Sequence, residues 1–198
     1  MKNRQRTHSH SQLWIAILIG GLSLTLAGCD SYSSLQPLYT EADLIFETSL
    51  LGVWHPKDSK ETIEFARADE KPYGKFAYKV TMKGADEKAD IRIARLLKVN
   101  DRMFLDIAPV ESPNENLLPV HTFHFVPQIT PKLRIAEIDL KWLVDFLAHN
   151  PAAIKHEKVD DRILLTAAPK ELQEFFLAHL GENGAFDSFE ELEKAPVY

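Results

Sequence analysis

Hydrophobic and polar residues alternate most regularly over residues 75–83, KFAYKVTMK. Phe76, Tyr78, Val80 and Met82 share one parity, whereas the other parity carries three lysines. Successive side chains of a β-strand point to opposite faces, so this pattern predicts a strand with one buried and one solvated side. Similar segments predict about eight strands joined by short connections. They are residues 50–56, 61–67, 75–83, 91–99, 102–108, 119–126, 132–138 and 162–167.

Helical periodicity begins after the seventh predicted strand. Residues 140–149 place apolar side chains on one face, Asp139 can cap the helix, and Asn150-Pro151 ends it. A second helix is predicted over residues 169–180, which begin with proline and are followed by glycine. Residues 187–194, DSFEELEK, open with the spacing of a capping box, which favours a third helix.

The order of these elements predicts a mainly β fold with flanking helices. Connections between the strands before residue 139 are too short for crossovers, which indicates an antiparallel meander. Such a sheet tends to close on itself because closure removes its exposed edges, so we expect a barrel or half-barrel. Residues 1–28 are predicted as a cleaved leader, residues 29–48 as a tether, and residues 49–198 as one globular domain.

Gly52-Val53-Trp54 stands at the head of the predicted meander. This G-x-W triplet resembles the signature on the first strand of the lipocalins, and a helix near the end of the barrel is also similar to that family. The resemblance implies a lipocalin-like barrel, but a fold does not by itself define a function.

The N-terminus has the layout of a secretory signal peptide. Lys2, Arg4 and Arg6 precede an apolar run over residues 13–26, which is shorter than the about 20 apolar residues that a spanning helix needs. The end of this run, Leu26-Ala27-Gly28-Cys29, resembles the lipobox of bacterial lipoproteins, and it contains the only cysteine of the chain. The alternative is that this cysteine is an ordinary buried residue.

The lipobox resemblance implies where the protein lies and how it is held. Cys29 would carry a diacylglyceryl group, the leader would be cleaved before it, and the new amino terminus would be acylated, so palmitate would label the protein. Two or three acyl chains hold a protein on a membrane more stably than one. The domain would then face the periplasm. Asp30 favours the inner membrane in the enteric lipoproteins that this sequence resembles, with the outer membrane as the alternative.

Acidic residues outnumber basic residues. The chain has 29 Asp and Glu against 23 Lys and Arg, a net charge of −6, and loss of residues 1–28 would make it −9. Binding to a nucleic acid backbone needs clustered cations, so nucleic acid is excluded as a partner. Once Cys29 is acylated, no cysteine remains for a disulfide, a thiolate metal site or a thiol nucleophile, and we expect no cofactor.

One charge interrupts an apolar parity. In residues 91–99, IRIARLLKV, Arg95 shares its parity with isoleucine, leucine and valine. A buried charge must be paired or must reach water. Arg95 is therefore predicted either to hold an anion inside the barrel or to be accommodated by a bulge near Ala94 or by an acid such as Glu64.

Four residues are the candidate ligand-binding set: Trp54, Tyr78, Arg95 and His121. They would suit a ligand with a carboxylate or phosphate head and an apolar body. His124 follows His121 by three residues, so the two rings would point to opposite faces of a strand and would not share a metal ion. No metal site is predicted.

No nucleophile elbow, phosphate-binding loop or paired acid motif is present in the sequence, so we expect no enzyme. The leading hypothesis is a lipid-anchored protein that binds a small, partly apolar ligand. The alternative is an interaction protein with a filled barrel, which docks an envelope protein through residues 140–149 and 169–180. Adjacent Phe175 and Phe176 favour this docking. A cavity of about 300 Å³ or more inside the barrel would separate the two hypotheses.

Overall fold

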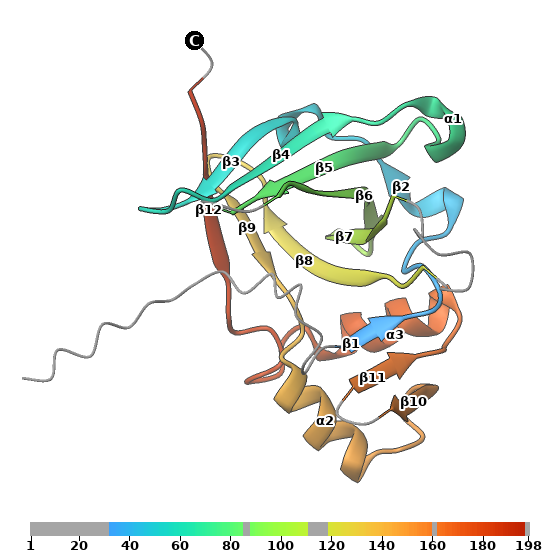
Figure 1. The fold of residues 1–198 in the computed structure, drawn as a ribbon. Helices are drawn as coiled ribbons and strands as arrows, with labels where there is room; N and C mark the ends of the chain where they lie inside the picture. The colour runs from blue at the N-terminus through green and yellow to red at the C-terminus, as the bar shows by residue number, and fades with distance from the viewer. Residues whose placement is uncertain (1–31, 85–87, 111–118, 160–161, 197–198) are drawn as a thin grey trace, which may run out of the picture.

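A computed structural model describes residues 32–84, 88–110, 119–159 and 162–196. The predicted leader, Cys29 and Asp30 lie outside these residues. The chain forms a closed antiparallel barrel, and a layer of helices and a small sheet packs against one side of it (Figure 1). The predicted fold class, a mainly β barrel with flanking helices, is confirmed.

Eight strands form the barrel. Seven follow one another as an up-and-down meander from β3 to β9, and β12 closes the ring by pairing with β3 and β9. A short helix, α1 (Glu70–Tyr73), connects β4 with β5. The strands are β3 (Gly52–Pro56), β4 (Thr62–Arg67), β5 (Ala77–Lys83), β6 (Asp90–Val99), β7 (Arg102–Pro109), β8 (Thr122–Gln128), β9 (Leu133–Ala136) and β12 (Glu190–Lys194).

The closing strand corrects a prediction, because residues 187–194 do not form a helix. Leu192 is fully buried inside the barrel, whereas Glu191 and Glu193 lie outside beside Lys132. This alternation over β12 carries a single apolar residue, so local sequence alone does not reveal the strand. The pairing with β3 and β9 decides its conformation.

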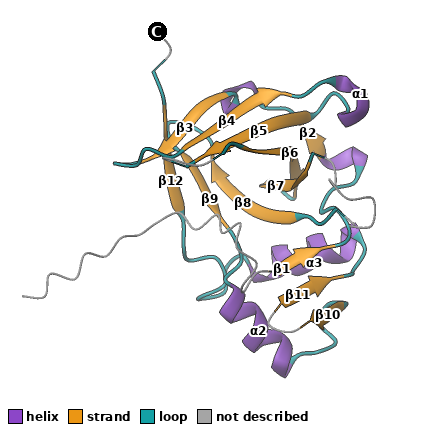
Figure 2. Cartoon of the chain, viewed as in Figure 1, coloured by secondary structure: helices purple, strands orange, loops and turns teal. Residues whose placement is uncertain are grey.

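A second layer covers the barrel wall at β8. It contains a three-stranded sheet in the order β1 (Tyr32–Ser34), β11 (Arg162–Leu165) and β10 (His156–Val159). Helices α2 (Leu140–His149) and α3 (Pro169–His179) complete the layer (Figure 2). The strand predicted over residues 162–167 therefore exists, but it belongs to this small sheet and not to the barrel.

Both predicted helices of this layer are confirmed, α2 with the predicted bounds. Asp139 Oδ1 accepts a hydrogen bond from Trp142 N–H at 2.7 Å, which satisfies one of the free donors at the helix start. Asn150 N–H closes the other end by donating to Phe146 O at 2.9 Å. Pro169 occupies the first turn of α3, where its missing N–H costs nothing.

Residues 32–48 belong to the fold, which corrects the extent of the predicted tether. Tyr32 and Leu38 are buried, and β2 (Leu44–Ile45) pairs with β6 beyond the point where β5 pairs with it. Two 3-10 helices, η1 (Glu41–Asp43) and η2 (Thr48–Leu50), lead into β3. The described part of the domain already includes Tyr32, well before residue 49.

The barrel wall is buried on both sides at β6, β7 and β8. Ala94 and Leu96 point into the barrel, while Leu97, Phe104 and Phe123 pack outside it against the second layer. A strand that is buried on both faces is a nearly continuous hydrophobic run. For this reason, the pattern over residues 91–99 does not reveal which face looks inward.

Candidate functional site

Trp54 and Tyr78, two of the four predicted ligand-binding residues, lie inside the barrel. Both side chains are 0% exposed, so no space that admits water touches either ring. Trp54 Nε1 donates to Leu50 O at 2.8 Å. The Tyr78 hydroxyl accepts from Glu47 N–H at 2.7 Å and donates to Glu47 O at 3.2 Å. These two rings fill the interior and do not line a cavity.

The segment before β3, residues 46–50, closes the end of the barrel at which β3 begins, and we call this segment the plug. Phe46 stacks on Tyr78 with the ring centroids 4.5 Å apart, and Leu50 is fully buried. Burial raises the pKa of the Tyr78 hydroxyl to about 12. The hydroxyl therefore stays protonated at neutral pH and keeps its donor bond to Glu47.

Arg95 and His121, the other two predicted residues, lie on the outer side of the wall, so their predicted inward placement is wrong. β6 pairs continuously with β5 and β7 through Arg95, with no shift in register. Arg95 Nη2 donates to Tyr73 O at 2.9 Å, and its guanidinium lies 5.3 Å from the centroid of the Tyr39 ring. The inward parity of β6 is that of Ala94.

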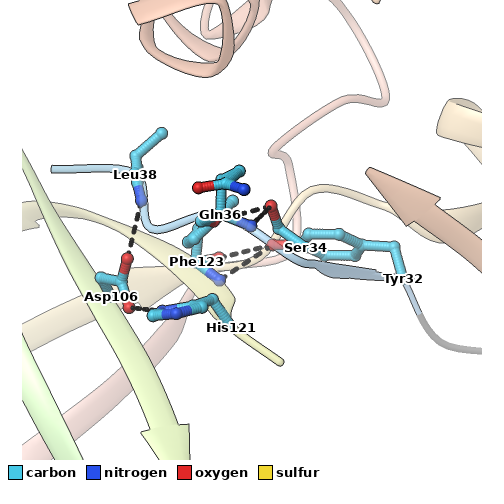
Figure 3. A network of polar contacts seen from close by, with 7 residues as sticks. All are labelled: Tyr32, Ser34, Gln36, Leu38, Asp106, His121 and Phe123. Carbon is cyan, nitrogen blue, oxygen red and sulfur yellow. Dashed lines mark hydrogen bonds and ion pairs between the residues drawn. The ribbon is translucent and has the colours of Figure 1, made fainter. Parts of the chain in front are cut away.

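Asp106 connects the outer wall to the N-terminal segment (Figure 3). Asp106 is only 2% exposed. Oδ2 accepts from Leu38 N–H at 2.7 Å, and Oδ1 lies 2.6 Å from Nδ1 of His121. Ser34 and His121 also exchange two backbone hydrogen bonds of 2.9 Å. The sequence pattern gave no indication of this network, because its members lie far apart in the chain.

Two further contacts hold the same segment. The Tyr32 hydroxyl donates to Phe123 O at 2.8 Å, and burial raises its pKa well above the ordinary value. Gln173 Nε2, on α3, donates to Leu38 O at 2.8 Å. Ser34 Oγ donates to Gln36 O at 2.7 Å and is thereby engaged with the backbone. The Asp106–His121 pair and these contacts together hold the N-terminal segment against the outer wall of the barrel.

Polar side chains gather on the inward parity at the end of the barrel opposite the plug. His124 is 5% exposed, and its Nδ1 lies 3.3 Å from Oε1 of Glu137. Arg92 forms an ion pair of 2.8 Å with Asp90. His124 and Arg92 are the inward histidine and arginine, one parity away from the predicted His121 and Arg95.

Glu190 lies at this polar end on β12. Burial raises its pKa to about 7, and the nearby charges of Glu61 and Glu137 add to the shift. Its Oε1 is buried and makes no hydrogen bond to a described residue. Within the described part of the chain, no three His, Cys, Asp or Glu side chains lie close enough together to hold a metal ion.

Phe175 and Phe176 do not form an exposed docking surface, which corrects the expectation based on their adjacency. Both are buried in α3. The Phe176 ring packs edge-on against Phe123 with centroids 5.4 Å apart, and Phe175 packs against Phe146 at 5.9 Å. One helix face contacts the sheet and the neighbouring face contacts α2, so both rings are used.

A groove of about 670 Å³ runs along α2 and the turn before β12, and we call it the α2 groove. Trp142 and Phe146 are half-buried there and stack with centroids 4.9 Å apart. His179 of α3 packs against both rings, at 5.1 and 4.6 Å. The groove is lined by Asp139, Lys141, Trp142, Asp145, Phe146, His149, Asn150, Gly184, Asp187 and Ser188.

This groove combines an apolar floor with an acidic rim. Three aspartates line it against one lysine and one histidine. Lys141 is already paired with Asp145 at 2.7 Å. A segment that presents an apolar side chain flanked by a basic residue would complement this surface, because unlike charges steer and orient an encounter.

Comparison with known proteins gave no relative. No family model, no curated protein and no solved structure matches this chain. Among the helices of the described residues, none is both long enough and apolar enough to cross a membrane.

Proposed function

We propose that this chain is a lipid-anchored protein of the bacterial envelope that acts by docking a protein partner and not by catalysis. The observation that carries the proposal is the filled barrel: Trp54 and Tyr78, which would line a ligand cavity, are completely buried among other core side chains. A barrel without internal space near these rings leaves its outer surface to make the contacts. The α2 groove is a hollow on that surface whose apolar floor and acidic rim suit a partner.

The anchor rests on the sequence. Cys29 would carry lipid, and the domain would lie on the periplasmic side, with Asp30 favouring the inner membrane over the outer membrane. Replacing Cys29 with alanine should abolish labelling with palmitate, because the acylated thiol is lost. Equal labelling of the variant and the wild type would contradict the lipid anchor.

Site-specific crosslinking tests the docking. A photo-crosslinking amino acid at Lys141, on the rim of the α2 groove, should give one discrete adduct in the native host. Glu64, exposed on β4 of the opposite barrel wall, is the matched control position. Trp142→Ala should reduce the adduct at position 141 by removing the groove floor. Equal adducts at both positions, or none at 141, would refute the α2 groove as a docking site.

A small ligand is the second candidate, and the polar end of the barrel favours it. Arg92, His124 and Glu190 share the inward parity there. A ligand would bind at this end, away from Trp54 and Tyr78. Native mass spectrometry of the protein purified from its own membrane would detect a bound small molecule, and its loss in Arg92→Leu would favour this candidate over docking.

A further inference from the structure

The distance from the predicted anchor to the fold is short. Three Cα-to-Cα steps separate Cys29 from Tyr32, the first residue of β1, and each step spans at most about 3.8 Å. Tyr32 therefore lies within about 11 Å of the acylated cysteine. Tyr32 has no slack of its own, because its ring is buried and its hydroxyl is bonded to Phe123.

A lipid anchor places Cys29 at the surface of the hydrocarbon core. Each headgroup layer of a bilayer is about 5–8 Å thick. A tether of about 11 Å spans little more than that layer, so the start of β1 is held at the headgroups. With such an anchor, the domain would not stand off from the membrane on a spacer.

The strands beside β1 determine what else lies at this end of the small sheet, where β1 starts. Tyr32 pairs with Ile163 of β11, and Ile163 pairs with Lys158 of β10. Neighbouring strands are about 4.8 Å apart, so Lys158 lies about 10 Å from Tyr32 across the sheet. Val159 and Arg162, the next pair in the register, lie at the same end of the small sheet.

The side chains at this end of the small sheet are suited to a bilayer surface. Val159 is 53% exposed, more than any other large hydrophobic residue of the described chain. Lys158 and Arg162 are both exposed beside it, and long basic side chains can reach lipid phosphates while their stems contact apolar groups. Val159 is a single apolar residue and not a patch, so the short tether carries the placement of these side chains at the bilayer.

We infer that one end of the small sheet lies against the lipid bilayer and fixes the orientation of the domain on the membrane. This end is formed by the start of β1, the end of β10 and the start of β11. This inference rests on the proposed lipid anchor. The segment 157–162, EKVDDR, contains three acids and two bases. Net positive charge therefore does not drive the contact, and anionic lipid is not required for it.

The absence of any cysteine besides Cys29 makes the test direct, because an introduced cysteine is the only free thiol of the lipidated protein. Val159→Cys in the full-length lipidated protein is labelled with an environment-sensitive fluorophore and reconstituted in phosphatidylcholine vesicles. Lys158→Cys, at the adjacent residue of β10, gives a second reporter. Glu64→Cys, on the opposite barrel wall, is the matched control.

Spin-labelled phosphatidylcholine in the vesicles should quench the label at positions 159 and 158 several-fold more than the label at position 64. A ten-residue Gly-Ser insertion between Asp30 and Ser31 adds about 18 Å of mean reach and should bring the quenching at position 159 down to that at position 64. The insertion leaves the lipobox intact, so the protein should still float with the vesicles.

The outcomes separate the inference from the proposed function. Equal quenching at all three positions, in protein that floats with the vesicles, overturns the inferred membrane face and leaves the lipid anchor in place. Unchanged quenching after the insertion overturns the role of the short tether. Protein that lacks the mass of the acyl chains and does not float overturns the anchor, and with it the inference.

Discussion

Replacing Glu190 with glutamine should stabilise the protein at alkaline pH much more than at acidic pH. Burial, together with the charges of Glu61 and Glu137, raises the pKa of Glu190 to about 7. Its buried Oε1 has no hydrogen-bond donor among the described residues. Glutamine has nearly the same shape and removes the charge that this site disfavours.

The sign and the size of the effect follow from the pKa. The folded-state pKa of about 7 is above the ordinary value of 4.5. Stabilisation by the protonated group is therefore fully present below pH 4.5 and is lost as the pH rises through about 7. At about 1.4 kcal/mol for each pKa unit, the full shift is worth about 3.4 kcal/mol, and partial exposure to solvent reduces this to about 2 kcal/mol.

Urea unfolding followed by tryptophan fluorescence measures this effect. The free energy of unfolding of Glu190→Gln minus that of the wild type should be about 1.5 kcal/mol larger at pH 8 than at pH 5, because part of the wild-type stabilisation is already lost at pH 5. Glu191→Gln, at the adjacent position outside the barrel, is the matched control substitution. A Glu190→Gln profile that stays parallel to the wild type would refute the buried, disfavoured charge.

Three further substitutions test other parts of the structure. Asp106→Ala should lower the free energy of unfolding by about 3 kcal/mol, because two buried hydrogen bonds to a charged acceptor are lost, and it should speed hydrogen exchange at Leu38; unchanged exchange there would contradict the network. Trp54→Ala should cost about 3–5 kcal/mol in urea unfolding if the barrel is filled, whereas a loss below about 1 kcal/mol would indicate a cavity. Arg95→Leu should cost only about 1 kcal/mol and should leave the native mass spectrum unchanged, because the side chain lies outside the barrel and partly in solvent; loss of a bound molecule would contradict this placement.

Local signals predicted the elements that depend on local interactions. Helix α2 was predicted with the observed bounds because Asp139 caps one end and Asn150-Pro151 ends the other. The strand β5 was predicted because one of its faces meets solvent, so its lysines alternate with core residues. In both cases, one side of the element contacts water and leaves a visible pattern.

Elements defined by distant partners were missed or misplaced. β12 contains four charged residues around Leu192, and only its neighbours β3 and β9 make it a strand. β1 consists of a tyrosine and two serines, and it is held by β11, Phe123 and His121. No pattern within three residues can indicate such contacts.

The candidate site was misplaced for a related reason. β6 is buried on both faces, so the parity with more apolar residues need not be the inward one. Taking that parity as inward led to Arg95 in place of Arg92. For β8, the same assumption led to His121 in place of His124.

The position of β12 in the chain has a consequence for how the protein matures. Its partner β3 is the first strand of the barrel, and β12 is the last strand of the described chain. Until β12 has been made, β3 and β9 each present an unpaired edge, and the core around Trp54 stays open on one side. Completion of the barrel must therefore follow synthesis of the chain as far as β12, because this long-range closure pairs the first strand of the barrel with the last. Under the proposed export, this order keeps the chain open, and therefore able to be threaded across a membrane, until β12 has been made.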